Sequence, residues 1–276
     1  MNKVITCDLC PRFCRLAENQ TGFCKARQNI DGKIKSLTYG KWLSIALDPI
    51  EKKPLAYFKQ GSMILSVGTF GCNMTCPFCQ NHQLARASVD DFPSKSLSPD
   101  ELVEQALDLK TIGNIGIAFT YNEPLINFEY IRDTAKLARQ ANLETVVVTS
   151  GQINKPYLEE LLPLISAWNI DLKSFSEAGY QRLGGDFKTT LETIRLAAEV
   201  AHVEITTLVV PKISDDLAEF KQQVDFIAQI EPEIPLHLTR YFPYYKYNEP
   251  PTSISLLQEM AKLARKKLNR VKIGNI

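Results

Sequence analysis

Three cysteines, Cys72, Cys76 and Cys79, follow one another closely in the segment GCNMTCPFC. A structural zinc site normally has four ligands and disulfides need an even number of thiols, so the spacing C-x3-C-x2-C suits neither. Thiolate is the soft ligand that iron–sulfur clusters require, and three thiolates can hold three irons of a cubane [4Fe–4S] cluster. The fourth iron would then remain open to a substrate or cofactor, as the fourth position of a catalytic zinc site does. The segment therefore predicts a catalytic metal centre.

Four further cysteines, Cys7, Cys10, Cys14 and Cys24, precede this segment. A full set of four thiols suits either a closed structural zinc site or a fully ligated auxiliary iron–sulfur cluster, and the spacing does not decide between them. Free or otherwise used thiols are the third alternative. A short and weakly apolar section of chain would gain stability from such a metal centre. Because all seven cysteines lie in the first 79 of 276 residues, a disulfide framework is disfavoured.

The composition is that of an ordinary soluble globular enzyme, with 45% apolar and 23% charged residues. The net charge is +1, from 32 basic and 31 acidic residues, which argues against a nucleic-acid partner. No apolar run approaches the length of a membrane span, and the first residues show no signal-peptide pattern. We therefore expect a cytoplasmic protein with no membrane partner.

Short apolar strands alternate with longer amphipathic stretches from residue 61 onward. Strands are predicted at 63–69, 116–120, 144–150, 167–174, 202–211 and 234–242, with a short final strand in RVKIGNI. Helices are predicted from 98 and over 125–141, 155–163, 188–201, 215–229 and 253–268. Strands buried on both faces and separated by helices indicate parallel pairing with right-handed crossovers. Six or so such units are too few for an eight-unit barrel, so an α/β fold with a partial, open-sided (β/α)6 TIM-like barrel is predicted over 61–276. A doubly wound open sheet is the rival, and residues 1–60 form a small Cys-rich N-terminal extension.

Local signals refine this outline at a few positions. Ser98 and Glu101 form a capping box that begins a helix, with Pro99 at its first position. The helix over 215–229 is expected to be opened by Ser214. Lys52 and Lys53 are adjacent charged residues, and the simplest prediction is that both side chains are exposed to solvent.

Polar motifs follow several of the predicted strands. TYNEP follows 116–119, VTSG ends the strand over 144–150, and DLK lies in 167–174. The carboxyl ends of parallel strands meet at one edge of a sheet, where active sites of such folds collect. We expect these motifs to lie close to the three clustered cysteines.

The motif C-x3-C-x2-C after the first barrel strand, with an aromatic residue at Phe78, closely resembles that of the radical S-adenosylmethionine (SAM) enzymes. The resemblance implies that Cys72, Cys76 and Cys79 hold a [4Fe–4S] cluster whose open iron binds S-adenosylmethionine. It implies reductive cleavage of this cofactor to a 5′-deoxyadenosyl radical that abstracts hydrogen. It also implies an external one-electron donor such as ferredoxin or flavodoxin.

The same resemblance assigns roles at the later strand ends. Glu123 lies where the family usually has Gly-Gly-Glu-Pro and would meet the methionine amino group, although Asn122 replaces a glycine. Lys173 would pair with the cofactor carboxylate, and Asp171 would supply a polar or cation-binding group. The turn with Ser150 resembles that of glycyl-radical-enzyme activases.

Three more residues complete the cofactor site that the resemblance implies. Phe78 and Gln80 flank the last cysteine of the motif. Phe242 lies where many relatives carry a histidine near the nucleoside, and it could stack on adenine.

Motifs along nearly the whole chain are similar to those of the AmmeMemoRadiSam-system radical SAM enzymes, relatives of pyruvate formate-lyase activating enzyme. These motifs include CDLCPRFC, DPIEKKPL, FTYNEP and IDLKSFSEAGYQRLGG. The Cys-Pro-x-Cys segment with which longer members continue is absent here. Three functions stay open. The enzyme could modify a small molecule or another macromolecule, it could activate a glycine of a partner protein, or the chain could be a non-catalytic iron–sulfur or zinc protein.

Overall fold

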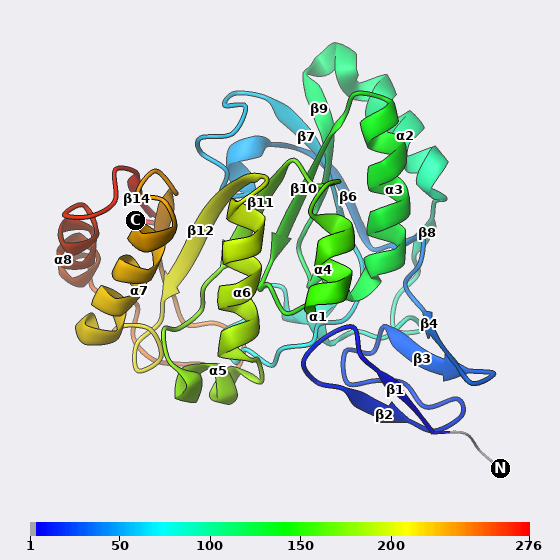
Figure 1. The fold of residues 1–276 in the computed structure, drawn as a ribbon, viewed down its shortest axis with the longest axis horizontal. Helices are drawn as coiled ribbons and strands as arrows, with labels where there is room; N and C mark the ends of the chain where they lie inside the picture. The colour runs from blue at the N-terminus through cyan, green and yellow to red at the C-terminus, as the bar shows by residue number, and fades with distance from the viewer. Residues whose placement is uncertain (1–3) are drawn as a thin grey trace.

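An eight-stranded sheet forms the centre of the computed structural model, which describes residues 4–276 (Figure 1). The strand order is β14-β13-β12-β11-β10-β9-β7-β6, and all neighbours pair in parallel except β6, which is antiparallel to β7. The strands are β6 (Ser44–Pro49), β7 (Met63–Gly68), β9 (Asn114–Phe119), β10 (Glu144–Thr149), β11 (Ala167–Asp171), β12 (His202–Val209), β13 (Leu236–Arg240) and β14 (Val271–Gly274). The mostly parallel α/β sheet predicted from the sequence is thus confirmed.

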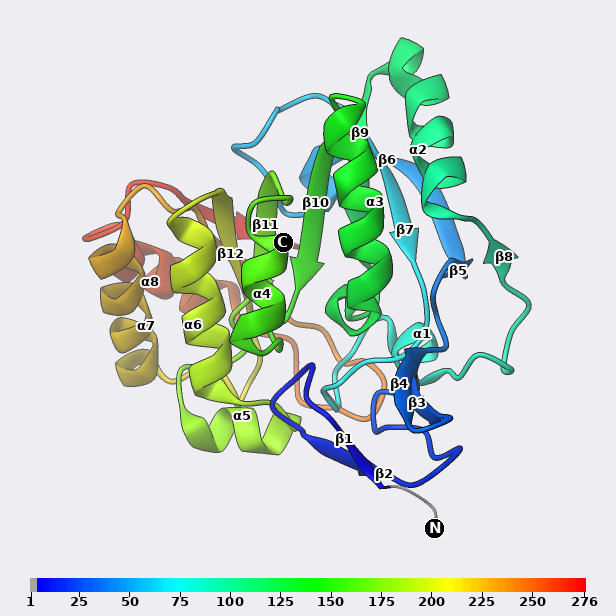
Figure 2. The same ribbon diagram turned by 45° about the vertical axis from the view of Figure 1, so that its right-hand side comes forward.

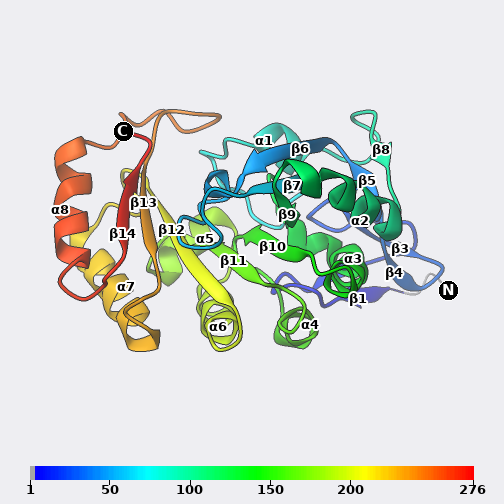
Figure 3. The same ribbon diagram turned by 90° about the horizontal axis from the view of Figure 1, so that it is seen from above.

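Helices fill the crossovers between the parallel strands. They are α1 (His82–Arg86), α2 (Pro99–Asp108), α3 (Phe128–Gln140), α4 (Lys155–Leu161), α5 (Glu177–Leu183), α6 (Phe187–Ala198), α7 (Leu217–Ile230) and α8 (Ile254–Ala264), with 3-10 turns at Ile50–Lys52, Leu109–Ile112 and Pro124–Asn127. The sheet curves, and α3, α4, α6, α7 and α8 lie along its outer side (Figure 3). The short helices α1 and α5 were not predicted, because neither is long enough to show a clear apolar period.

Side-chain caps set where the longer helices begin. Helix α2 has the predicted capping box, in which the backbone N–H of Glu101 donates to Ser98 and that of Ser98 donates to Glu101. Helix α7 begins later than predicted, because Asp216 and not Ser214 accepts the first free N–H groups. Ser214 instead donates its hydroxyl proton to the carbonyl of Leu208 within the preceding turn.

The Cys-rich extension forms two small hairpins below the sheet. They pair β1 (Ile5–Cys7) with β2 (Cys14–Leu16) and β3 (Arg27–Ile30) with β4 (Lys33–Ser36), and β5 (Lys41–Trp42) pairs with β8 (Lys95–Ser96). Figures 1 and 2 both place β1 to β4 at the carboxyl ends of the parallel strands, beside α1 and α5. The extension therefore lies at the edge where the polar motifs were expected.

Residues 44–60 contribute to the barrel itself. Strand β6 is the antiparallel edge of the central sheet, and the segment that follows crosses its concave side (Figure 3). Ile50 and Leu55 are fully buried in a cluster with apolar residues of β7, β9, β10 and β11. The predicted division at residue 60 therefore falls after a strand of the central sheet.

The prediction of a solvated charge pair at Lys52 and Lys53 is wrong for the second lysine. Lys53 is 2% exposed, its ammonium lies 2.8 Å from Asp48 Oδ2, and it sits 4.6 Å from the ring centre of Tyr121. The sequence could not show that a carboxylate of β6 and an aromatic face would enclose it. Among residues 4–276, no helix combines the length and the apolar character needed to cross a membrane.

Candidate active site

A cavity of about 380 Å³ opens at the carboxyl ends of the parallel strands. Cavities of this size hold ligands as large as a nucleoside cofactor. All of the predicted cluster and cofactor residues except Phe242 line it, namely Cys72, Cys76, Phe78, Cys79, Gln80, Asn122, Glu123, Ser150, Asp171 and Lys173. Residues from four separate segments of the chain thus meet where the parallel-strand argument predicted.

The three clustered thiols face this one cavity from the loop after β7. Desolvation raises the pKa of Cys76 to about 11, although the nearby ammonium of Lys173 opposes the shift. Burial likewise raises the pKa of Cys72 and of Cys79. Without a metal the thiols therefore hold their protons, which a thiophilic metal displaces on binding. Three soft ligands on one cavity, with room beside them, fit a three-ligated iron–sulfur cluster.

Asn122 holds the cysteine-bearing loop against the end of β9. Its Nδ2 donates to the carbonyls of Phe70 and Gly71, each at 3.1 Å, and its Oδ1 accepts from the backbone N–H of Thr69 at 3.1 Å. A glycine at this position could make none of these bonds. The departure from Gly-Gly-Glu-Pro therefore has a structural consequence here, namely a side-chain connection between the loop and TYNEP.

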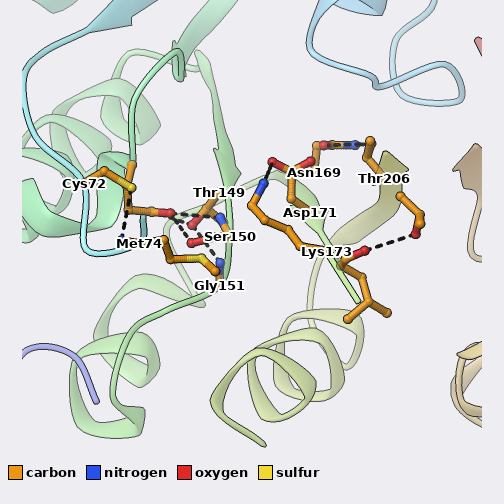
Figure 4. A network of polar contacts seen from close by, with 12 residues as sticks. Cys72, Met74, Thr149, Ser150, Gly151, Asn169, Asp171, Lys173 and Thr206 are labelled. Atoms are coloured by element: carbon orange, nitrogen blue, oxygen red, sulfur yellow. Dashed lines mark hydrogen bonds and ion pairs between the residues drawn. The ribbon is translucent and has the colours of Figure 1, made fainter. Parts of the chain in front are cut away.

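Glu123 connects the ends of β9 and β10 through a buried carboxylate that is 3% exposed. Oε1 accepts from the Thr149 hydroxyl at 2.6 Å and the Leu125 N–H at 3.1 Å. Oε2 accepts from the hydroxyl and the N–H of Ser150, at 2.6 and 2.9 Å (Figure 4). Desolvation raises the pKa of Glu123, and the bonds from Ser150 and Thr149 oppose the rise. The carboxylate is thus held at the cavity wall close to Cys72, with which it interacts electrostatically.

Lys173 brings a positive charge to the cavity wall at the end of β11. Its Nζ lies 2.9 Å from Asp171 Oδ2, and both side chains are mostly buried at the end of β11 (Figure 4). Desolvation disfavours the charge, but Asp171 and the neighbouring Cys76 outweigh it and raise the pKa of Lys173. The ammonium therefore stays charged and is available to an anionic group in the cavity.

Sequence reasoning missed several lining residues. Tyr121 has a left-handed backbone at φ +72°, and its hydroxyl donates to Asp48 at 2.7 Å. Strain of this kind in a residue without glycine's freedom gathers at functional sites. The other lining residues that were not predicted are Pro54, Met74, Asn81, Ala85, Thr120, Val148, Thr149, Thr206, Leu208, Thr239 and Asn275. For Thr120, Val148, Thr149, Thr206, Leu208, Thr239 and Asn275, a position near the end of a strand was the available signal.

Phe242 does not line the cavity. It is 41% exposed, and the Arg240 guanidinium lies 4.8 Å from its ring centre. The loop that follows packs on the cysteine-bearing segment, with Tyr245 stacked on His82 at 4.2 Å between ring centres. Adenine stacking on Phe242 therefore stays a prediction.

The other four cysteines lie in the extension beside this site. Cys7 and Cys24 are buried, Cys10 and Cys14 are partly buried, and all four are free thiols. None of them lines the cavity.

Comparison with known proteins identifies the family. The model of the radical SAM superfamily matches residues 66–224, which span the cysteine motif and the strands from β9 to β12. The chain belongs to the radical SAM superfamily. The superfamily uses a [4Fe–4S] cluster and S-adenosylmethionine, and the thiols and charged groups of the cavity suit both.

Two related proteins align with this radical SAM protein over more of its chain than residues 66–224. The chain is 36% identical over 279 residues to the "Uncharacterized protein MJ0808" of Methanocaldococcus jannaschii, covering 100% of this chain and 82% of that protein. It is 26% identical over 211 residues to the pyruvate formate-lyase-activating enzyme of Clostridium pasteurianum, covering 72% of this chain and 86% of that enzyme. Similarity to glycyl-radical-enzyme activases is thus shown.

The fold agrees with a solved structure, that of Streptococcus suis SuiB bound to S-adenosylmethionine. The TM-score is 0.60 at 15% identity, over 77% of this chain and 52% of SuiB. This chain thus spans about half the length of SuiB. At this identity the likeness concerns the fold alone.

Proposed function

We propose that this protein is a radical SAM enzyme that holds a [4Fe–4S] cluster through Cys72, Cys76 and Cys79 and abstracts hydrogen from a substrate. The observation that carries the proposal is the shared cavity, in which three thiols meet a buried carboxylate and an ammonium. When bound and reduced by one electron, the cluster supplies reductive cleavage of S-adenosylmethionine to methionine and a 5′-deoxyadenosyl radical, which takes a hydrogen atom from the substrate.

The residues of the cavity have distinct parts in this proposal. Lys173 binds the carboxylate of S-adenosylmethionine, and Asp171 keeps the ammonium charged and oriented. Glu123 accepts from the amino group, which requires one of its present donors to turn away, and the hydroxyls of Thr149 and Ser150 can rotate to do so. Charge-assisted bonds of this kind orient a zwitterionic ligand.

Phe78, Gln80, Asn122 and Ser150 complete the proposed cofactor wall, and Phe242 would join it if the 241–250 loop moves. The electron comes from an external donor of the ferredoxin or flavodoxin class. We place the enzyme in the cytoplasm, where thiols stay reduced.

For the substrate, we propose a glycine of a partner protein. The similarity to pyruvate formate-lyase-activating enzyme supports this, and the SuiB fold has also been solved with the precursor peptide SuiA. Modification of a small molecule or another macromolecule, as the narrower AmmeMemoRadiSam resemblance suggests, is the second candidate.

The test is formation of 5′-deoxyadenosine by anaerobically reconstituted and reduced protein. We expect the wild type to form it from S-adenosylmethionine and the Cys76→Ala variant to lose it. A cluster-loaded wild type that neither forms 5′-deoxyadenosine nor changes its electron paramagnetic resonance spectrum with S-adenosylmethionine would favour a non-catalytic protein. If the wild type forms 5′-deoxyadenosine, addition of a glycyl-radical enzyme should give the electron paramagnetic resonance signal of a glycyl radical. Formation of 5′-deoxyadenosine without that signal would point to a different substrate.

A further inference from the structure

The four N-terminal cysteines gather in one place. Cys7 and Cys14 are direct partners across the β1–β2 hairpin, so their side chains leave the same face, and Cys10 lies in the turn between them. Cys10 interacts electrostatically with Cys7 and Cys14, and Cys24 interacts with Cys7 and Cys10. A hairpin with three-residue strands has few means to order itself otherwise.

Two positively charged side chains enclose these thiols. Arg27 is 5% exposed and interacts with Cys7, and its Nε has no hydrogen-bond partner within the described part of the chain. Arg12 interacts with Cys10 and Cys14. Buried cations are costly unless anions face them. Glu129 balances part of the charge of Arg27 at 2.6 Å, and metal-bound thiolates would supply further negative charge on the cysteine side.

The thiol group adjoins the loop that carries Cys72. The side chain of Asn73 interacts with that of Cys10, and Arg12 Nε donates to the Asn73 carbonyl at 2.6 Å. The carbonyl of Cys24 packs so closely on Gly71 that a Cβ there would lie 2.1 Å from it. Residues 71–73 thus form a wall between the two groups of cysteines.

Zinc and a cubane cluster require different distances between the cysteine sulfurs that bind them. Tetrahedral zinc with bonds of about 2.3 Å holds its sulfurs about 3.8 Å apart. No group of three or more His, Cys, Asp or Glu side chains in residues 4–276 is arranged to hold one metal ion. Cys72, Cys76 and Cys79, which we propose to be ligands of a cluster, are likewise not arranged around one metal ion. A cubane binds its cysteines at separate iron corners, so its sulfurs lie farther apart than around one ion.

We propose that Cys7, Cys10, Cys14 and Cys24 bind a second [4Fe–4S] cluster, fully ligated by cysteine and separated from the catalytic cavity by residues 71–73. Full ligation leaves this centre no open iron. It therefore does not bind S-adenosylmethionine. This inference does not depend on the proposed reaction.

The test uses two complementary variants of the full chain. One replaces Cys72, Cys76 and Cys79 by alanine, and the other replaces the four N-terminal cysteines. After anaerobic reconstitution and gel filtration with a chelator, iron, sulfide and zinc are counted per chain. We expect about eight irons in the wild type and about four in each variant, from two cubanes of four irons each.

The spectra then assign the centres. The reduced paramagnetic resonance spectrum of the triple variant should be insensitive to S-adenosylmethionine, and that of the quadruple variant should respond to it. Zinc in place of iron in the triple variant, or a triple variant without metal, would overturn the inference. If either variant does not fold, the iron count of the wild type decides. About four irons per wild-type chain, with or without one zinc, would also overturn the inference. Failure of the proposed reaction appears separately, as a quadruple variant whose cluster ignores S-adenosylmethionine.

Discussion

Glu204, in strand β12, connects the central sheet to the segment around Ala56 and Tyr57, which follows β6. Its carboxylate is fully buried and accepts the backbone N–H groups of Ala56 and Tyr57 at 3.0 and 2.7 Å. It also meets the Nε2 atoms of His202 and His237 at 2.9 and 2.6 Å. Because the same segment carries Pro54 into the cavity lining, this network holds the cavity floor.

The pKa of Glu204 gives the size of its contribution. Burial opposes the charge, but the bonds from His202 and His237 outweigh it and lower the pKa to about 2. An unfolded glutamate has a pKa of about 4.3, so the difference is worth about 3 kcal/mol of folding free energy at neutral pH. Since the folded pKa is the lower one, this stabilisation is present above pH ~4.3 and is lost as the pH falls toward ~2.

We expect Glu204→Gln to lower the free energy of unfolding by about 3 kcal/mol at pH 7, from the same linkage. The amide cannot accept at both ends, so a buried N–H of Ala56 or Tyr57 also loses its acceptor. Urea unfolding at pH 7 and pH 3 measures the effect. The gap between wild type and variant should shrink to about half at pH 3, because the carboxylate is then mostly protonated in the unfolded chain and still mostly ionised in the folded protein.

The exposed Glu199 provides the matched control, because Glu199→Gln should change the free energy of unfolding by less than about 0.5 kcal/mol. A loss below about 1 kcal/mol for Glu204→Gln, or a gap that does not depend on pH, would refute the role given to this carboxylate.

Three further predictions concern the cavity wall, the cysteine-bearing loop and a helix start. Lys173→Gln should weaken S-adenosylmethionine binding about 10- to 100-fold, as expected for loss of a bond to a charged group; an unchanged affinity in equilibrium titration would remove Lys173 from the site. Gly71→Ala should lower the melting temperature more than Gly61→Ala, because both glycines have φ near +80° but the new Cβ meets the Cys24 carbonyl only at residue 71; equal shifts would mean that this contact is unimportant. Ser98→Ala should cost about 1 kcal/mol in urea unfolding through loss of the α2 cap, and no measurable change would contradict the capping role.

Much of the fold and the site could be predicted because the signals are local. Runs such as ETVVVT read as buried parallel strands, and Ser98 with Glu101 marked the beginning of α2. Polar motifs directly after strands must meet at one edge, which is why Cys72, Glu123 and Lys173 line one cavity. The resemblance to a known family added roles that spacing alone does not define.

Other features depended on contacts between distant segments. The burial of Lys53 needs Asp48 and Tyr121, and the segment around Ala56 needs Glu204 as its acceptor. Asn122 holds a loop some 50 positions earlier. Phe242 does not line the cavity, because its exposed ring lies against Arg240, and its contact with adenine stays a prediction.

The sequence by itself determined which residues are available for chemistry, because three thiols in eight residues and the motifs after the strands are local properties of the chain. Only the tertiary structure decided that the extension lies at the carboxyl edge of the sheet. There Arg12 and the Cys24 carbonyl touch the loop of Cys72. Such contacts join residues far apart in the chain, and their formation depends on how the whole sheet curves and which surfaces it leaves to be covered.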